Sequence, residues 1–210
     1  MKVPVSMKLI DTHAHLEDIE RLDEALERAE KVGVVAVITM GSDYESNLWA
    51  LEESIKYQRK GLRIHPALGL HPWGLDPSKV DVNLSLIEEN IGKAVAVGEI
   101  GLDYWYKEAR EDEERKKQQR ILFQRLLEIA ERNGKPTSIH SRGAWKDCLD
   151  ITIESGIEKA VFHWFSGPLD ALRELLDQGY YVSATPAAVY SKEHRSVVEN
   201  TPLDLSLIHI

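Results

Sequence analysis

The chain has little cysteine, no long apolar run and no excess of positive charge. Its 210 residues include one cysteine, Cys148, which excludes an internal disulfide framework and is typical of a reducing cytoplasm. No apolar run reaches the roughly 18 residues of a membrane-spanning helix, so we expect no contact with a membrane. The first seven residues lack the apolar centre of a secretory signal. We therefore predict a cytoplasmic protein.

Basic residues are also scarce. The formal net charge is -9 at pH 7, from 26 Lys and Arg against 35 Asp and Glu. A protein that grips an extended stretch of nucleic-acid backbone is normally electropositive, so this charge argues against such a grip. It does not exclude a phosphate substrate, because bound divalent cations would reverse the charge locally.

No linker, low-complexity tract or charge block divides the chain, and we predict one domain over residues 1–210. A composition of 43% hydrophobic and 29% charged residues is ordinary for a globular protein. Apolar runs alternate with helical patterns seven times, which indicates parallel strands joined by right-handed crossovers. The expected strands are 9–10, 34–40, 62–70, 94–99, 137–140, 160–163 and 180–184, and the expected helices are 21–31, 43–60, 83–90, 111–133, 145–155, 168–178 and 192–199.

This alternation, with polar residues at the strand ends, predicts a (β/α)₈ TIM-type barrel that is incomplete and ends after about strand seven. A doubly wound open sheet is the alternative, but no Gly-rich phosphate loop follows the first strand. A typical barrel of this kind takes about 250 residues. The apolar tail 205–210 begins the eighth strand or is artefactual, since it resembles a translated transposon sequencing adapter.

Histidines gather at the predicted strand ends. Asp11, His13 and His15 alternate after an apolar strand, and alternate side chains of a strand share a face. Two imidazoles side by side are good ligands for a divalent ion, although solvated or buried histidines fit this stretch equally well. The rest of the chain favours a metal site, because five of the eight histidines lie at strand ends, namely His13, His15, His71, His140 and His163.

One carboxylate, Glu99, ends the predicted strand 94–99 among these histidines. A carboxylate can bridge two cations and hold them roughly 3.5–4 Å apart, as two-metal hydrolases require. The alternative is a helix-capping or salt-bridged carboxylate. Gly98 and Gly101 weaken it, because they leave space for close approach around Glu99.

The order of five motifs resembles the TatD-type family of metal-dependent deoxyribonucleases and related hydrolases. The resemblance covers roughly residues 8–204. The motifs are Asp11-Thr12-His13-Ala14-His15, Gly69-Leu70-His71-Pro72, Gly98-Glu99-Ile100-Gly101-Leu102-Asp103, Ile139-His140-Ser141-Arg142 and Phe162-His163-Trp164-Phe165-Ser166-Gly167.

The resemblance implies a phosphodiesterase with two divalent ions (Mg, Mn or Zn) and a substrate that is DNA or a small phosphodiester. His13 and His15 would hold one ion, Glu99 would bridge and act in catalysis, and His140 and His163 would hold the other. No obligate protein partner is evident.

The family also places a metal-binding aspartate in a Glu-Thr-Asp motif on the eighth strand. That motif is absent here, and Asp204 precedes the expected strand without it. Because loss of general-base help typically costs roughly 10²–10⁴-fold, we expect residues 1–210 to be weakly active or inactive. An unpaired strand at the barrel edge would also favour association.

Three further residues are candidates for substrate binding. Arg142 would contact a phosphate oxygen or pair with an acidic neighbour. His71 would bind substrate at the mouth or cap a loop. Asp103 would contact substrate or orient a histidine from behind.

Two other functions stay open. A metal-dependent amide or lactone hydrolase uses the same barrel and the same His-x-His opening, but often bridges its ions with a modified lysine where Glu99 stands here. A non-catalytic metal-binding fragment is the third possibility. The tryptophans after strand ends, Trp73, Trp105, Trp145 and Trp164, would stack on bases or pack loops.

Overall fold

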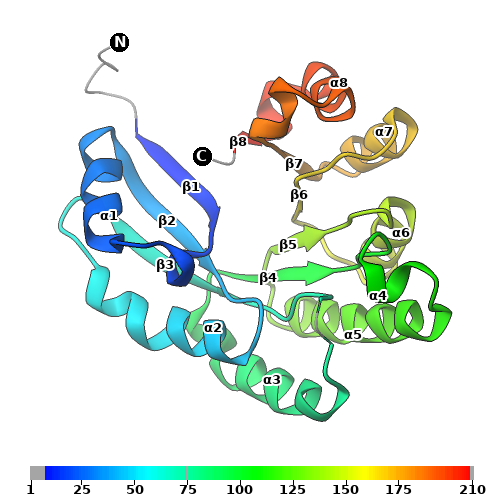
Figure 1. Ribbon diagram of the computed structural model, residues 1–210, viewed down its shortest axis with the longest axis horizontal. Coiled ribbons are helices and arrows are strands. Elements are labelled where there is room, and N and C mark those ends of the chain that lie inside the picture. The colour runs from blue at the N-terminus through cyan, green and yellow to red at the C-terminus, as the bar shows by residue number, and fades with distance from the viewer. Residues whose placement is uncertain (1–7, 74, 209–210) are drawn as a thin grey trace.

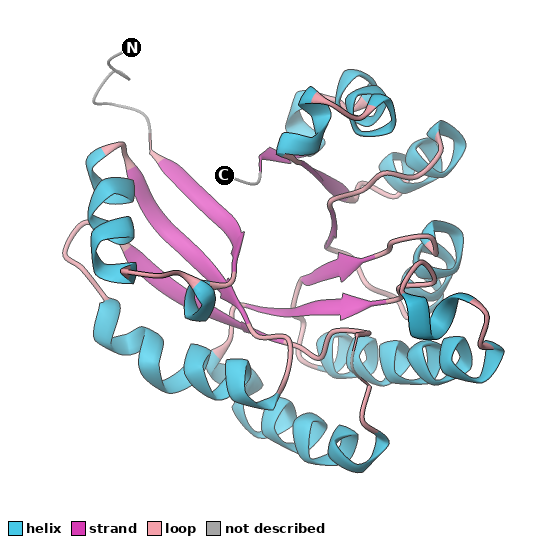
Figure 2. Cartoon of the chain, viewed as in Figure 1, coloured by secondary structure: helices cyan, strands magenta, loops and turns pink. Residues whose placement is uncertain are grey.

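A computed structural model describes residues 8–73 and 75–208. Eight parallel strands form one curved sheet in the order β1-β2-β3-β4-β5-β6-β7-β8. The helices lie on the outside of this sheet, and β1 and β8 stand at its two ends (Figure 1). Figure 2 shows the same two layers, with strands inside and helices outside. The predicted (β/α)₈ barrel is confirmed.

The strands are β1 (Leu9–Ala14), β2 (Val34–Met40), β3 (Arg63–Leu68), β4 (Ala96–Gly101), β5 (Thr137–His140), β6 (Ala160–His163), β7 (Tyr181–Ala184) and β8 (Ser206–Ile208). The helices are α1 (Leu22–Lys31), α2 (Tyr44–Leu48), α3 (Pro77–Asn90), α4 (Lys107–Arg110), α5 (Glu113–Arg132), α6 (Trp145–Glu154), α7 (Leu169–Asp177) and α8 (Lys192–Asn200).

Of the two alternatives for the tail, the start of an eighth strand is confirmed, so the sheet extends one short strand beyond strand seven. Ser206, Leu207 and Ile208 pair in parallel with Val182, Ser183 and Ala184 of β7. The open edge of β7 offers unpaired backbone groups, and the tail satisfies them as β8. Whether residues 205–210 are artefactual stays a prediction, and residues 209–210 lie outside the described part. The sheet order of the described residues runs from β1 to β8 and has no ladder between those two strands.

Two predicted helices differ from the structure by more than two residues at one end. The helix expected over 43–60 is α2, followed by a π-type turn over Trp49–Glu53 and a 3₁₀ turn over Ser54–Tyr57. After these turns, the Gln58 side chain bonds to both backbone groups of Ile64, with Nε2 2.6 Å from the carbonyl oxygen. The helix expected over 83–90 begins at Pro77, where Asp76 accepts from the Ser78 backbone N–H at 3.0 Å.

The main core lies between β4 and β5 and the outer helix α5. Phe123, Leu126 and Leu127 of α5 are fully buried in the same cluster as Ile100 and Ile139 of the two strands. Burying such side chains stabilises the fold by about 1.5–3 kcal/mol each. This packing fixes the ends of β4 and β5, which carry Glu99 and His140.

In the described part of the chain, no helix is both long enough and apolar enough to cross a bilayer. The cytoplasmic location stays a prediction, and the N-terminal residues on which it partly depends lie outside the described range.

Candidate metal centre

A cavity of about 660 Å³ opens at the carboxyl ends of the strands. Active sites of (β/α)₈ enzymes lie at this end because the loops after the strands converge there. The cavity is lined by His13, His15, Asp18, Ser42, Asp43, Leu70, His71, Trp73, Glu99, Tyr106, His140, His163 and Trp164. All five predicted metal ligands are therefore in its wall.

Glu99 stands at the centre of two groups of ligand atoms. One group is His13, His15 and Glu99, and the other is His71, Glu99 and His140; within each group the ligand atoms lie within 4.8 Å of one another. Oε2 of Glu99 is 3.4 Å from the Nε2 atoms of both His13 and His15. Oε1 faces the other group, 3.1 Å from His140 Nδ1 and 3.6 Å from His71 Nε2. The two oxygens of one carboxylate thus serve two separate sets of imidazoles.

The carboxyl group of Glu99 has a lowered pKa despite its burial. Only 5% of the residue is exposed, and burial by itself raises the pKa of a carboxyl group. The surrounding His13, His140 and His15 outweigh that effect and hold the pKa of Glu99 well below its usual value. A buried anion among imidazoles is the donor set that divalent ions take.

Two shifts in strand register lie beside these side chains. The β1–β2 register slips between Asp11 and Ala14, where the Asp11 carboxylate accepts from the His13 backbone N–H at 3.1 Å. The β4–β5 register slips between Val97 and Ile100, on either side of Glu99. An irregularity of this kind, such as a β-bulge, turns a strand locally and can redirect a side chain.

Gly98 and Gly101 serve the neighbouring strand rather than the space around the Glu99 carboxylate. A Cβ on Gly101 would lie 2.0 Å from the His140 carbonyl oxygen, and one on Gly98 would lie 2.7 Å from Ser138 Cβ. Their φ angles are +139° and +157°. Glycine therefore lets β4 and β5 approach closely at the site.

The two histidines of the first group are each contacted from behind. His15 Nδ1 lies 3.7 Å from Glu17 Oε1, and His13 Nδ1 lies 3.2 Å from Ser138 Oγ. Contacts with Glu17, followed by those with Glu99, raise the pKa of His15 to about 10. Sequence reasoning missed both Glu17 and Ser138. Glu17 follows His15 by two residues, a spacing that allows a short turn to bring the two side chains together.

In the second group, the fully buried Asp103 holds His140. Its Oδ2 lies 2.8 Å from His140 Nε2 and accepts from the Trp73 indole N–H at 2.6 Å. Burial lowers the pKa of His140, but hydrogen bonds to Asp103 and Glu99 outweigh it and raise that pKa to about 9. This geometry fits the predicted orienting role of Asp103 better than a contact with substrate.

His163 lies in the same wall but outside both groups of ligand atoms. Its ring stacks on that of His13, with centroids 3.5 Å apart and planes 3° apart. Its Nδ1 is 3.3 Å from Ser183 Oγ, which also accepts from the Trp164 backbone N–H at 3.0 Å. The role of His163 as a ligand stays a prediction.

The mouth of the cavity is aromatic. Trp73 stacks on Tyr106 with centroids 5.4 Å apart, and both line the cavity. Trp73 is 45% exposed and Trp164 is 46% exposed. Arg142 is exposed and does not belong to the cavity lining. Tyr106, which the sequence did not single out, is thus nearer to the site than Arg142.

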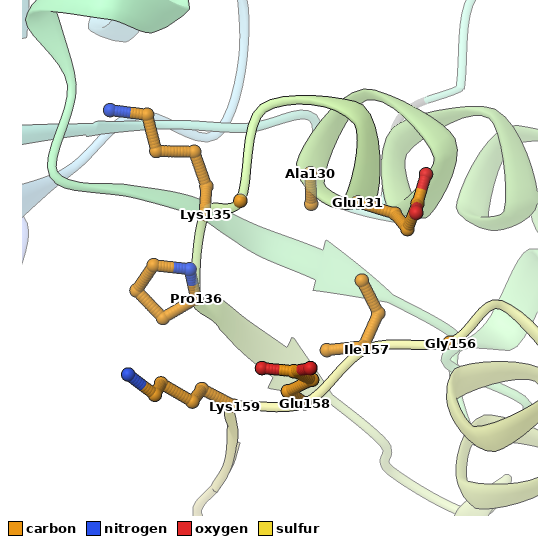
Figure 3. Close-up of a pocket in the computed structure, with 9 residues that line it drawn as sticks. Ala130, Glu131, Lys135, Pro136, Gly156, Ile157, Glu158 and Lys159 are labelled. Carbon is orange, nitrogen blue, oxygen red and sulfur yellow. The ribbon is translucent and has the colours of Figure 1, made fainter.

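A smaller cavity of about 240 Å³ lies at the amino-terminal ends of β5 and β6. Figure 3 shows Lys135 and Lys159 extending to the same side of it. The Lys135 ammonium donates to the Ala94 carbonyl oxygen at 2.6 Å, so it serves to hold a loop. The lining of this cavity contains no histidine, which distinguishes it from the metal centre.

Comparison with known proteins agrees with this geometry. The sequence pattern of the family described as "TatD related DNase" matches residues 10–208. The human protein "Deoxyribonuclease TATDN3" is 31% identical over 204 residues, which cover 93% of this chain and 74% of that protein. An "uncharacterized metal-dependent hydrolase" of Methanocaldococcus jannaschii is 32% identical, over 94% of this chain and 76% of that protein.

Solved structures agree as well. The structure of a TatD family hydrolase from Entamoeba histolytica superposes with a TM-score of 0.83 at 27% identity, and the match covers 97% of this chain and 73% of that one. Sequence pattern, relatives and fold all coincide with the ordered histidine and glutamate motifs. The chain belongs to the TatD-related DNase family.

Proposed function

We propose that the chain is a divalent-metal-dependent hydrolase that cleaves phosphodiester bonds in DNA or in small phosphodiesters. The observation that carries this proposal is the single buried carboxylate of Glu99, whose two oxygens face two separate sets of imidazoles. Membership of the TatD-related DNase family supports the choice of phosphodiesters over other substrates.

The donor set fits divalent ions. His13, His15 and Glu99 would hold one ion, and Glu99 and His140 would hold a second. The family resemblance adds His163 to the second set, although its ring stacks on that of His13. Such ions act as Lewis acids on a phosphoryl oxygen and lower the pKa of a bound water. The candidate ions are Mg²⁺, Mn²⁺ and Zn²⁺, because imidazole and carboxylate together suit all three.

The side chains that contact His15 and His140 from behind influence the protonation and the orientation of these rings. Glu17 and Asp103 are acceptors, so they favour a proton on the outward nitrogen of His15 and His140, and the nitrogen nearer Glu99 is then the one that would bind an ion. Such support keeps the rings in one orientation before an ion arrives.

The cavity also suits a substrate that is small or that enters with the end of its own chain. The net charge of -9 opposes a long electrostatic contact with DNA. Trp73 and Trp164 each expose nearly half of their surface in the cavity wall, where they can stack against bases. A strand end or a small phosphodiester meets both conditions.

The test is hydrolysis by the purified chain with Mg²⁺, Mn²⁺ or Zn²⁺ against single-stranded DNA, bis(p-nitrophenyl) phosphate and a panel of amides. Because the Glu-Thr-Asp motif of the eighth strand is missing, we expect weak phosphodiester cleavage, and we expect EDTA to abolish it. Glu99→Gln should reduce it by more than the roughly 10–100-fold typical of losing a residue that only orients a ligand.

The matched control is Glu128→Gln, which changes an exposed glutamate on α5 and should leave activity unchanged. Cleavage of amides alone would exclude the proposal, and so would full activity of Glu99→Gln.

A further inference from the structure

The ring of His71 is held by a hydrogen bond whose direction is fixed. The backbone N–H of Trp73 donates to His71 Nδ1 at 3.1 Å. A backbone N–H can only donate, so Nδ1 must present its lone pair to it. A neutral imidazole carries one ring proton, and in His71 that proton is therefore on Nε2. The indole of Trp73, edge-on to the ring with centroids 4.7 Å apart, packs against it and fixes its plane.

His71 and His140 turn different ring nitrogens toward Glu99. The Asp103 carboxylate accepts from His140 Nε2, so that nitrogen carries a proton, and the other nitrogen of His140, Nδ1, lies 3.1 Å from Glu99 Oε1. In His71 the protonated Nε2 is the atom that faces this same oxygen, at 3.6 Å. That distance is too long for a good hydrogen bond, so the Glu99 oxygen is a poor partner for the N–H.

We propose that His71 is a fixed hydrogen-bond donor to a phosphoryl oxygen of the substrate and not a metal ligand. This inference rests on the proposed function. The spacing of the ligand atoms alone would admit His71 to a metal group with Glu99 and His140. The lone pair of His71 Nδ1 argues against metal binding. An ion could bind Nε2 only if the proton moved to Nδ1, and that move would break the hydrogen bond from the Trp73 backbone N–H.

The acceptor for the Nε2–H of His71 is then a phosphoryl oxygen of the substrate in the cavity. His71 lines the cavity beside Trp73 and is 91% buried, so its Nε2 proton meets whatever occupies the space near Glu99. A preorganised donor of this kind acts where negative charge grows during hydrolysis, and removing one typically lowers kcat about 10²–10³-fold.

The direct test is ¹⁵N NMR of the histidine rings in the wild-type protein. With EDTA present, we expect His71 to show a protonated Nε2 and an unprotonated Nδ1. Titration with Zn²⁺ should leave that pattern in place while the resonances of His140 change. A proton on Nδ1, or a His71 Nε2 that loses its proton and binds Zn²⁺, would overturn the inference.

Substitutions give a second test. His71→Ala should keep its Zn²⁺ affinity within about 3-fold by calorimetry, whereas His140→Ala should lose about 100-fold or more, since even residues behind a ligand contribute 10–100-fold. On bis(p-nitrophenyl) phosphate, His71→Ala should lower kcat about 10²–10³-fold. His71→Gln places an amide N–H near the position of Nε2 and should recover about 10-fold or more of that loss.

The two proposals fail in different ways. A wild-type protein that neither binds Zn²⁺ nor cleaves phosphodiesters would end the proposed function, while the ring protonation of His71 would still be measured in the same sample. Loss of Zn²⁺ affinity in His71→Ala, in a wild type that is active, would end this inference alone.

Discussion

Asp103 connects the metal centre to the aromatic wall of the cavity. Its two oxygens accept from His140, from the indole of Trp73 and from the backbone N–H groups of Trp105 and Tyr106, at 2.6–2.9 Å. Burial raises the pKa of this carboxyl group, but the bonds from His140 and Trp73 outweigh it and lower the pKa below its usual value. Because the buried Asp103 orients both a predicted ligand and a wall of the cavity, a substitution of Asp103 should affect both.

We therefore expect Asp103→Asn to weaken Zn²⁺ binding about 10–100-fold, as is typical when the partner behind a metal-binding histidine is lost. The amide cannot accept from all four donors, so His140 loses its fixed tautomer. Calorimetric titration with Zn²⁺ measures the effect. Asp81→Asn, at an exposed residue paired with Arg125, is the control and should bind Zn²⁺ like the wild type. Equal affinities in the two variants would rule out this role of Asp103.

At the scale of elements, the site depends on how closely the end of β3 approaches β4. A Cβ on Gly69 would lie 2.5 Å from the Gly98 carbonyl carbon and 2.7 Å from the Glu99 nitrogen. The same turn is held by the fully buried Asn47, whose side chain bonds to both backbone groups of Gly69 at 2.7 and 3.0 Å. Helix α2 thereby fixes the loop that carries His71 against the strand that carries Glu99.

We expect Gly69→Ala to move the Glu99 backbone, because no flexible side chain can yield there. The variant should bind Zn²⁺ at least about 10-fold more weakly, the lower end of the effect of displacing a ligand's support. Overpacking should also lower its free energy of unfolding by about 1–3 kcal/mol. Gly92→Ala is the matched control, since an added Cβ there meets nothing within 4 Å. Calorimetry and urea unfolding of both variants check this, and an unchanged Gly69→Ala protein would contradict it.

At the scale of the whole molecule, the candidate ligands join distant parts of the sheet. His13 and His15 belong to the first strand and its loop, whereas Glu99 and His140 belong to β4 and β5. Among the described residues, β1 is hydrogen-bonded in the sheet to β2 and not to β8. A bound ion would therefore tie the first part of the barrel to its middle, and stability should depend on metal and on pH together.

The metal-free protein should lose stability as the pH rises from 7 to 9. His15 and His140 have folded-state pKa values of about 10 and about 9, above the ordinary 6.5. A histidine whose pKa is raised by folding contributes its full stabilisation of the folded state below pH 6.5. That contribution is lost as the pH rises toward the folded-state pKa. We limit the pH range to 9 because burial also raises the pKa of Cys148, and this thiol would cause a further loss of stability above pH 9.

Divalent metal should reverse this trend, because ions bind neutral imidazole and their binding strengthens as protons leave. Zn²⁺ at 100 times its Kd should stabilise the fold by about 2.7 kcal/mol, and each 1 kcal/mol raises the Tm of a chain of this size by about 2–4 °C. Calorimetry in EDTA and in Zn²⁺ at pH 7, 8 and 9 measures both effects. A Tm that does not change with pH in EDTA, or a Zn²⁺ effect that Glu99→Gln retains, would contradict this account.

The barrel and most of the cavity wall could be predicted from the amino-acid sequence. Unbroken apolar runs such as Val34–Met40 and helices with one apolar face leave few alternatives to parallel strands with helices outside. Because all strands of such a barrel end at one rim, histidines at those ends were bound to converge, and His13, His15, His140 and His163 do line one cavity.

The contacts that distinguish these residues from one another come from the folded chain. The register shifts beside His13 and Glu99, the eighth strand and the contact of Asp103 with His140 each depend on a neighbouring strand or loop far away in the sequence. The same holds for His71, whose proton is placed by one backbone N–H. Residue spacing can bring an imidazole to the site, but hydrogen-bond partners fix which of its nitrogens carries the proton, and those partners exist only in the folded chain.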